Sequence, residues 1–172
     1  FATCEKIRLE NLVLGHKSPG YCIGGVLEFN LCKDVVVRYC DLYGSGTIGI
    51  SMENVEGFLL EGSMVRQCTY GLLYAQDSRS LRFIDTVFSD TGDYTLVSFE
   101  KSCTDVNFSG CIFSGNRGIV LLGASAQSAG IKLSQCRFEK NTTKRLVSGP
   151  GRFTFDRCIF DENAFPDPVN GQ

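Results

Sequence analysis

The chain has 172 residues, of which 43% are hydrophobic and 21% charged, a composition that excludes a disordered chain and suits one ordinary domain. Its formal net charge is −2, which argues against a nucleic-acid-binding module driven by bulk positive charge. No apolar run reaches the length of a membrane-spanning helix, so we expect no membrane partner. Because the chain begins at Phe1 rather than at a methionine, we expect it to be a fragment of a larger protein.

One pattern recurs seven times along the chain, with apolar residues at its first, third and eighth places and a small or apolar residue at its sixth. The copies begin 22–28 residues apart. They are IRLENLVLGHK (7–17), VVVRYCDLYGS (35–45), FLLEGSMVRQC (58–68), LRFIDTVFSDT (81–91), VNFSGCIFSGN (106–116), IKLSQCRFEKN (131–141) and FTFDRCIFDEN (153–163). A fixed repeat of this length is the signature of a solenoid.

Within each copy the apolar residues alternate with polar ones, which predicts strands with one buried face. A further apolar stretch precedes five of the copies, at residues 25–29, 49–52, 71–75, 95–99 and 118–122. Each period therefore predicts about three short strands joined by bends. Val36, Leu59, Leu73 and Val120 are expected to point outward.

Stacked coils convert each column of the repeat into a ladder of like side chains in parallel sheets. The sequence thus predicts an all-β, parallel β-helix solenoid of about seven coils with 22–28 residues per coil. It forms a single domain, 1–172, with repeats over about 4–163 and a C-terminal tail at 164–172. A β-sandwich is the alternative, but it does not require one column to stay aromatic through Phe88, Phe113, Phe138 and Phe160, which we expect inside.

The copies close on CIFSGN (111–116), CRFEKN (136–141) and CIFDEN (158–163). With these closing segments the sequence resembles the right-handed parallel β-helix repeat family, also described as pectate-lyase-like or carbohydrate-binding and sugar-hydrolase repeats. The resemblance implies a right-handed solenoid, as the general rule for parallel crossovers also does. It says little about activity, because lyases, hydrolases, epimerases, phage tail proteins and non-catalytic modules share the fold. This chain departs from the family by placing cysteine or a small residue where an inward asparagine is common.

The nine cysteines are an odd number, so at least one thiol cannot pair within the chain. Cys111, Cys136 and Cys158 share one column and are expected to be free, buried and unreactive. A bridge between Cys22 and Cys32 stays open. No cysteine spacing matches a zinc site, and we expect no metal and no cofactor. Unpaired thiols favour a reducing, cytoplasmic compartment.

Catalytic signatures are sparse. The single histidine, His16, lies on an expected loop without a nucleophile motif, and the polygalacturonase-type motifs of the resembling family are missing. Asp85, Asp90 and Asp93 form the best acidic concentration, although Asp and Gly in this run also have a turn explanation. Two carboxylates in a cleft beside a lysine or arginine would favour catalysis. A flat apolar and aromatic face would favour a partner instead.

We therefore expect a non-catalytic binding or scaffold module that presents a sheet face to a glycan or protein partner. The alternative is a carbohydrate-active enzyme, a polysaccharide lyase or glycoside hydrolase. Flanking domains or further coils are expected, because the ends of a solenoid expose unpaired strand edges. The expected ligand-binding residues are the tyrosines and aspartates at outward or corner positions: Tyr39, Tyr43, Asp85, Asp90, Asp93 and Tyr94.

Overall fold

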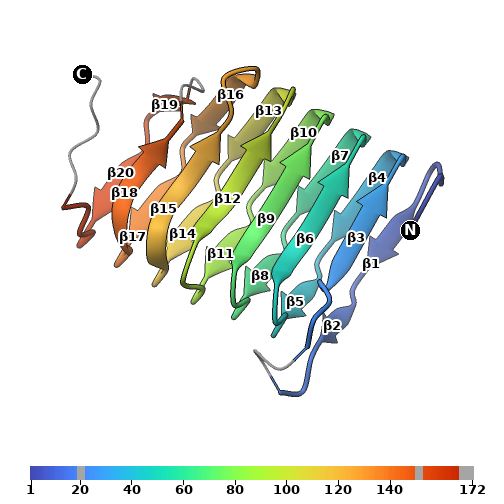
Figure 1. Cartoon of the computed structure of the whole chain (residues 1–172), viewed down its shortest axis with the longest axis horizontal. Helices are drawn as coiled ribbons and strands as arrows, with labels where there is room; N and C mark the ends of the chain where they lie inside the picture. Colours follow the sequence, from blue (N-terminus) through green and yellow to red (C-terminus); the bar gives the residue numbers. More distant parts are fainter. Residues whose placement is uncertain (19–21, 150–152, 167–172) are drawn as a thin grey trace.

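The computed structural model describes residues 1–18, 22–149 and 153–166. Its regular elements are strands β1 to β20, with no helix among these residues. No described helix has the length and hydropathy needed to cross a membrane. The strands wind into coils that follow one another along the long axis, from the N-terminal coil in blue to the C-terminal coil in red (Figure 1).

Three parallel sheets form the walls of the solenoid, and we number them by their first strand. Sheet 1 contains β1 (Arg8–Glu10), β4 (Lys33–Arg38), β7 (Glu56–Glu61), β10 (Arg79–Ile84), β13 (Thr104–Ser109), β16 (Ala129–Ser134) and β19 (Phe153–Asp156). Sheet 2 contains β2 (Val13–Gly15), β5 (Asp41–Tyr43), β8 (Met64–Arg66), β11 (Val87–Ser89), β14 (Ile112–Ser114), β17 (Arg137–Glu139) and β20 (Ile159–Asp161). Sheet 3 contains β3 (Leu27–Asn30), β6 (Ile48–Glu53), β9 (Gly71–Gln76), β12 (Thr95–Glu100), β15 (Arg117–Ala124) and β18 (Thr142–Ser148).

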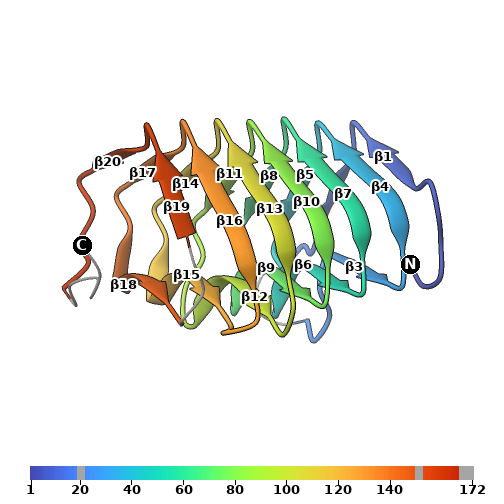
Figure 2. The same cartoon turned by 90° about the horizontal axis from the view of Figure 1, so that it is seen from above.

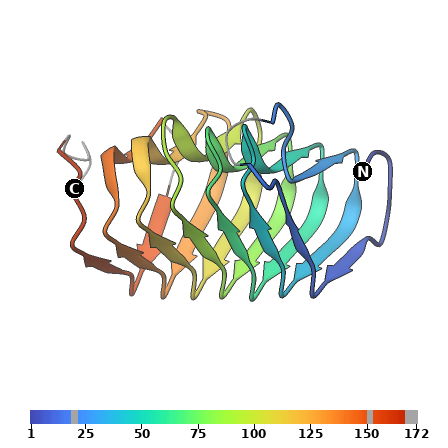
Figure 3. The ribbon, with the colours of Figure 1, turned by 90° about the horizontal axis from the view of Figure 1, so that it is seen from below.

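The parallel solenoid predicted from the repeat is confirmed, and the number of coils is corrected. Sheets 1 and 2 have seven strands each, whereas sheet 3 has six. The described chain therefore completes about six turns rather than seven, since no third strand follows β20. Figures 2 and 3 show the stack from opposite sides, with the first and last coils at its two ends.

The pairing register reproduces the sequence columns. Phe83 pairs with Phe108 across β10 and β13, and Phe113 pairs with both Phe88 and Phe138 across β11, β14 and β17. The rings of Phe88 and Phe113 stack with centroids 5.2 Å apart, and those of Phe113 and Phe138 with centroids 4.8 Å apart. Since these side chains are fully buried, the aromatic ladder forms the centre of the core.

Each corner between sheets 1 and 2 contains one residue with positive φ, a conformation favoured by Gly, Asn and Asp. Between sheets 1 and 2 these residues are Asn11, Tyr39, Gly62, Asp85, Gly110, Gln135 and Arg157. Gly62 serves a second purpose, because a Cβ there would lie 2.8 Å from the ring of Tyr39. The ring therefore covers the glycine of the next coil.

At most corners the next residue points inward and caps the turn through its side chain. At the corner between sheets 1 and 2, Cys40 Sγ donates to the carbonyl of Arg38 at 3.1 Å, and Ser63 Oγ donates to that of Glu61 at 2.9 Å. Thiols and hydroxyls in this column thus donate to the same kind of backbone carbonyl, which explains why cysteine, serine and threonine interchange there. All nine cysteines are free.

The corner between sheets 2 and 3 carries a buried amide ladder. Asn116 Nδ2 donates to the carbonyl of Phe88 at 2.9 Å and to Asn141 Oδ1 at 3.0 Å. Asn141 Nδ2 repeats this with the carbonyl of Phe113 at 2.8 Å and with Asn163 Oδ1 at 2.9 Å. The closing asparagines of the repeat therefore point inward. The expected replacement of inward asparagine by cysteine or a small residue holds at the corner between sheets 1 and 2 and is wrong at this corner.

Two expectations about burial are wrong. Phe160 stacks on Phe138 but is 47% exposed, because no coil follows β20 to cover its other face. Leu73 and Val120, expected outward, are buried. At the start of β9, the adjacent residues Leu72 and Leu73 both contact the core. Of the tail at 164–172, residues 167–172 lie outside the described part of the chain.

Candidate functional site

The six residues expected to bind a ligand lie on sheet 2 and along its two borders. Tyr39 and Asp85 lie on the border with sheet 1, whereas Asp90 lies on the border with sheet 3. Asp93 and Tyr94 follow Asp90 in the loop before β12, and Tyr43 lies on the outer side of β5. The strands of sheet 2 have three residues each, so the two borders are only about 10 Å apart.

Tyr94 belongs to an exposed column at the border between sheets 2 and 3. Tyr70, Tyr94 and Ile119 occupy equivalent positions just before the pairing residues of β9, β12 and β15. They are 46%, 55% and 45% exposed, and the two tyrosine rings meet edge to face at 5.1 Å. The amide of Ile119 donates to the carbonyl of Tyr94 at 3.1 Å. We call these three residues the shelf.

The backbone next to the shelf adopts two unusual conformations, at Asp93 and at Gly118. Asp93 has a φ of 104°, which costs a non-glycine residue about 1–3 kcal/mol and is typical of functional sites. Gly118 has a φ of 149°, and a Cβ there would lie 2.8 Å from the carbonyl oxygen of Tyr94. A glycine at 118 is therefore needed for Ile119 to approach Tyr94.

A hollow of about 230 Å³ adjoins the shelf. It is lined by Asp90, Thr91, Gly92, Gly115 and Arg117. The carboxylate of Asp90 accepts a bond from Ser89 Oγ at 2.9 Å. The guanidinium of Arg117 is exposed and has no partner among the residues that the structure describes. The hollow therefore offers both a carboxylate acceptor and a cationic donor beside the aromatic rings.

On the outer face of sheet 2, the charged and aromatic side chains around Arg66 contact one another. Arg66 binds Asp41 through two hydrogen bonds of 2.9 and 2.8 Å, and its guanidinium lies 4.6 Å from the ring centroid of Tyr43. The hydrogen bonds that Arg66 donates to Asp41 raise the pKa of Arg66. Tyr43 is thus held against a cation on its own face.

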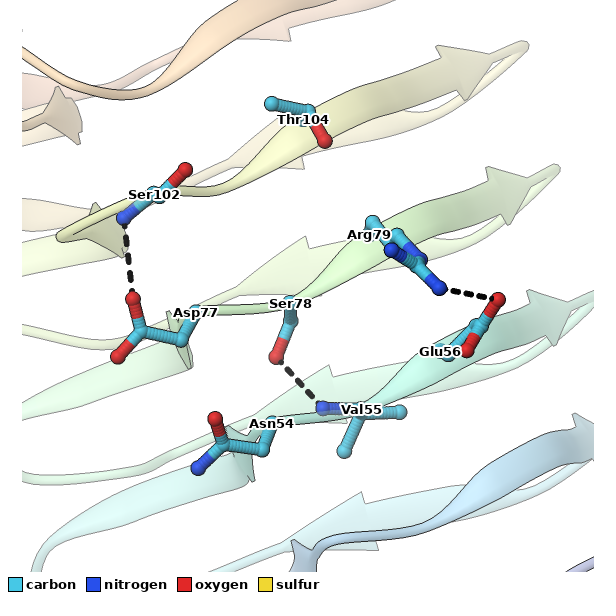
Figure 4. Close-up of a pocket in the computed structure, with 8 residues that line it drawn as sticks. All are labelled: Asn54, Val55, Glu56, Asp77, Ser78, Arg79, Ser102 and Thr104. Carbon is cyan, nitrogen blue, oxygen red and sulfur yellow. Dashed lines mark hydrogen bonds and ion pairs between the residues drawn. The ribbon is translucent and has the colours of Figure 1, made fainter.

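A second hollow, of about 350 Å³, lies at the corner between sheets 3 and 1 (Figure 4). It brings together two carboxylates, Glu56 and Asp77, which the sequence analysis did not select. Arg79 Nη2 lies 2.7 Å from Glu56, and Lys101 Nζ lies 3.5 Å from Asp77. Asp77 also accepts a bond from the backbone amide of Ser102 at 3.3 Å.

The hydrogen bond from Arg79 lowers the pKa of Glu56. Glu56 is therefore suited to work as an anion and unsuited to donate a proton at neutral pH. A glycosidase needs one carboxyl group that stays protonated beside one that is ionised. The second hollow is lined by two carboxylates and a cation, and the lowered pKa of Glu56 disfavours it as the acid.

The comparisons agree with this architecture. The sequence profile described as right handed beta helix region matches residues 10–165. The chain belongs to this family. Its right-handed winding, expected from the resemblance and from the crossover rule, is thereby confirmed. No curated protein matches the chain.

Two solved structures compared with this chain have low sequence identity and low TM-scores. A protein of Parabacteroides merdae that bears the provisional name of a glycosyl hydrolase shares 13% identity, with a TM-score of 0.41, over 93% of this chain and 83% of that one. QnrB1, a plasmid-mediated fluoroquinolone resistance protein, shares 8% identity, with a TM-score of 0.21, over 90% of this chain and 92% of that one. Neither similarity bears on activity.

The expected ligand-binding residues do not include three residues around the shelf: Tyr70, which belongs to the set of tyrosines expected at outward or corner positions, and Ile119 and Arg117, which sequence reasoning missed. The available signal was positional, since Tyr70 and Tyr94 each stand directly before an expected strand. Among the described residues no group of three or more His, Cys, Asp or Glu side chains is arranged to hold a metal ion.

Proposed function

We propose that the chain is a non-catalytic, glycan-binding β-helix module that holds its ligand on the shelf. The observation that carries the proposal is the in-register column of Tyr70, Tyr94 and Ile119 beside a polar hollow. In most outward columns of this solenoid, charged and polar residues recur. A run of three exposed apolar or aromatic side chains in successive coils is a departure that the fold does not require.

The size of the site favours a sugar over a protein. Three successive coils at about 4.8 Å give the shelf a length of about 10 Å, and the adjoining hollow holds about 230 Å³. A stable protein interface buries about 800 Å² on each partner, far more than this column can supply. One or two sugar rings match the site.

The chemistry also matches. A pyranose ring has an apolar C–H face that packs on a tyrosine ring, while its hydroxyl groups project from the rim. Tyr94 supplies the ring, and Asp90 and Arg117 lie where hydroxyl groups would need an acceptor and a donor. Because Arg117 has no described partner, it can bind a ligand without losing an internal bond.

Titration calorimetry with a panel of oligosaccharides tests the proposal. The panel contains the hexaoses of cellulose, xylan and mannan together with hexagalacturonate, each with and without calcium. We expect one member to bind, with Tyr94→Ala weakening it roughly tenfold, the loss of one aromatic stacking contact.

Tyr39→Ala is the matched control, because Tyr39 is 59% exposed but lies on the opposite border of sheet 2. It should leave the affinity unchanged. Lack of binding by every member of the panel, or equal loss in the two variants, would contradict a glycan site on the shelf.

A second candidate function, a carbohydrate-active enzyme, is favoured by one observation, the shared hollow of Glu56, Asp77 and Arg79 (Figure 4). Release of reducing ends or of unsaturated products from the same panel tests it. Turnover that disappears in Asp77→Asn and in Glu56→Gln, but persists in Tyr94→Ala, would establish this activity and place it away from the shelf.

A further inference from the structure

The outer face of sheet 2 carries an apolar strip that neither the shelf nor the hollows explain. Met64, Val87 and Ile112 are paired in register on successive coils and point outward, each partly exposed. Val13 continues the column in the first coil, where it is 71% exposed, after an interruption by Asp41. We call Val13, Met64, Val87 and Ile112 the strip.

The dimensions of this face suit an α-helix. Its strands have three residues, so the face is about 10 Å wide, and the five coils from Val13 to Ile112 span about 20 Å. A helix with its side chains is about 10–12 Å across, and about 13 residues cover 20 Å. A hollow of about 440 Å³ deepens the border beside Val13, Tyr39 and Met64, leaving room for side chains from above.

Two acidic side chains border the strip at β11. Asp85 precedes this strand and Asp90 follows it, both exposed. Asp85 has no hydrogen bond or ion pair through its carboxylate among the described residues, and Asp90 is bonded only to Ser89. Of the two cations nearby, Arg66 is held by both oxygens of Asp41, and Arg117 lines the same hollow as Asp90. The flank at Asp85 therefore carries a carboxylate that no described side chain pairs, and Asp90 adds a second carboxylate on the opposite flank.

We propose that the outer face of sheet 2 is the docking surface for an amphipathic helix of a partner protein, with an apolar stripe bordered by lysine or arginine. The stripe covers the strip, and the basic side chains reach Asp85 and Asp90 on either side. Charge complementarity of this kind selects the partner and its orientation, while the apolar contact supplies most of the affinity.

Other occupants fit less well. An added β-strand would need free backbone groups, whereas the interior strands of sheet 2 are paired on both sides. The cytoplasmic surface of a membrane is anionic and would be repelled by Asp85 and Asp90. A helix needs neither backbone groups nor a positive surface.

The two methionines of the chain make a direct readout. Met64 lies in the strip, and Met52 is fully buried in the core, so a protein with ¹³C-labelled methionine methyl groups gives one reporter signal and one internal control. The probe is a capped peptide of about 14 residues with a leucine stripe flanked by lysines. Its control has glutamate in place of every lysine.

We expect the lysine peptide to shift the Met64 signal and leave Met52 unchanged. The glutamate peptide should bind at least tenfold more weakly. Fluorescence anisotropy with labelled peptide should show that Asp85→Asn weakens the lysine peptide by roughly two- to fivefold, and that high salt removes this difference.

Val87→Lys should weaken the peptide at least tenfold. The matched control is Leu59→Lys, which changes an outward residue of sheet 1 with similar part-exposure and should have no effect. An unmoved Met64 signal at saturating peptide, equal binding of the glutamate peptide, or equal loss in Leu59→Lys would each overturn the proposal. Tyr94→Ala should leave peptide binding intact, so this result and that of the glycan titration are independent.

Discussion

The column of Phe88, Phe113 and Phe138 and the column of Tyr70, Tyr94 and Ile119 differ in what repetition does for them. The first points inward, is fully buried and stacks ring on ring. The second points outward and changes to a lysine at Lys144, the residue paired beyond Ile119. Stacking forces the inner column to repeat, because each side chain is the packing partner of the next. The outer column is free to vary, so a run of exposed apolar and aromatic side chains in three successive coils points to binding.

The largest effect should come from the inner column. Phe113→Ala removes a ring that packs on both Phe88 and Phe138, and we expect a loss of about 3–5 kcal/mol in the free energy of unfolding. Phe160→Ala is the matched control, since it occupies the same column but is 47% exposed and should cost much less. Denaturant unfolding measures both; equal losses would mean that burial does not decide the stability of the ladder.

Asn141→Ala should have the next largest effect. Its amide bonds both the carbonyl of Phe113 and Asn163, and its Oδ1 accepts the backbone amide of Asn116 at 3.2 Å. Removing it leaves buried backbone groups unsatisfied, which costs about 2–3 kcal/mol. Chemical denaturation measures the free energy of unfolding. A value equal to that of the parent protein would show that water replaces the amide and that the ladder is dispensable.

Cys111→Ser should be milder. Cys111 Sγ contacts the carbonyls of Phe83 at 3.3 Å and Ser109 at 3.6 Å, and Ser63 already fills the same column with a hydroxyl. We expect a loss of about 1 kcal/mol or less. The side-chain hydrogen bond with Cys136, together with burial, raises the pKa of Cys111, so native Cys111 should resist labelling until denaturant is added. Rapid labelling of this residue in the folded protein would show that the column is open.

The smallest effect concerns an exposed ion pair in an outer column. Arg82 Nη2 lies 2.7 Å from Asp105 and lowers the pKa of that carboxyl group below its ordinary 3.8. A lowered pKa stabilises the fold above the ordinary value, and the contribution is lost as the pH falls through the folded pKa. Asp105→Asn should cost less than about 1 kcal/mol at pH 7, and the difference should shrink below pH 3.8. A difference that stays constant in urea unfolding down to pH 2 would contradict the ion pair.

The inner and outer columns also divide what the sequence could predict. Alternation and the recurrent phenylalanines predicted the solenoid, because inward positions obey one rule in every coil. The expected burial of Phe160 and the expected number of turns were wrong, since the sequence of one repeat does not show whether another coil covers that repeat. The expectation for Leu73 was wrong because Leu72 and Leu73 are both buried, and period-two alternation cannot identify two adjacent residues that both contact the core.

The candidate site was predictable only in part. Tyr94 and Asp90 were selected as exposed turn residues, but Tyr70 and Arg117 approach them from neighbouring coils through the register of sheet 3. Glu56 and Asp77 meet for the same reason, 21 residues apart in sequence but on adjacent coils. Such pairs depend on the length of each coil, and a shift of one residue would separate them.

Hydrogen–deuterium exchange with and without the tightest-binding oligosaccharide of the panel tests the central claim most directly. The glycan should slow exchange at residues 70, 90–95 and 115–119, which include the shelf and its hollow, and leave the corner at residues 54–56 and 77–79 unchanged. Protection confined to the corner at 54–56 and 77–79, or no protection with any member of the panel, would show that the exposed tyrosine column is not the binding site.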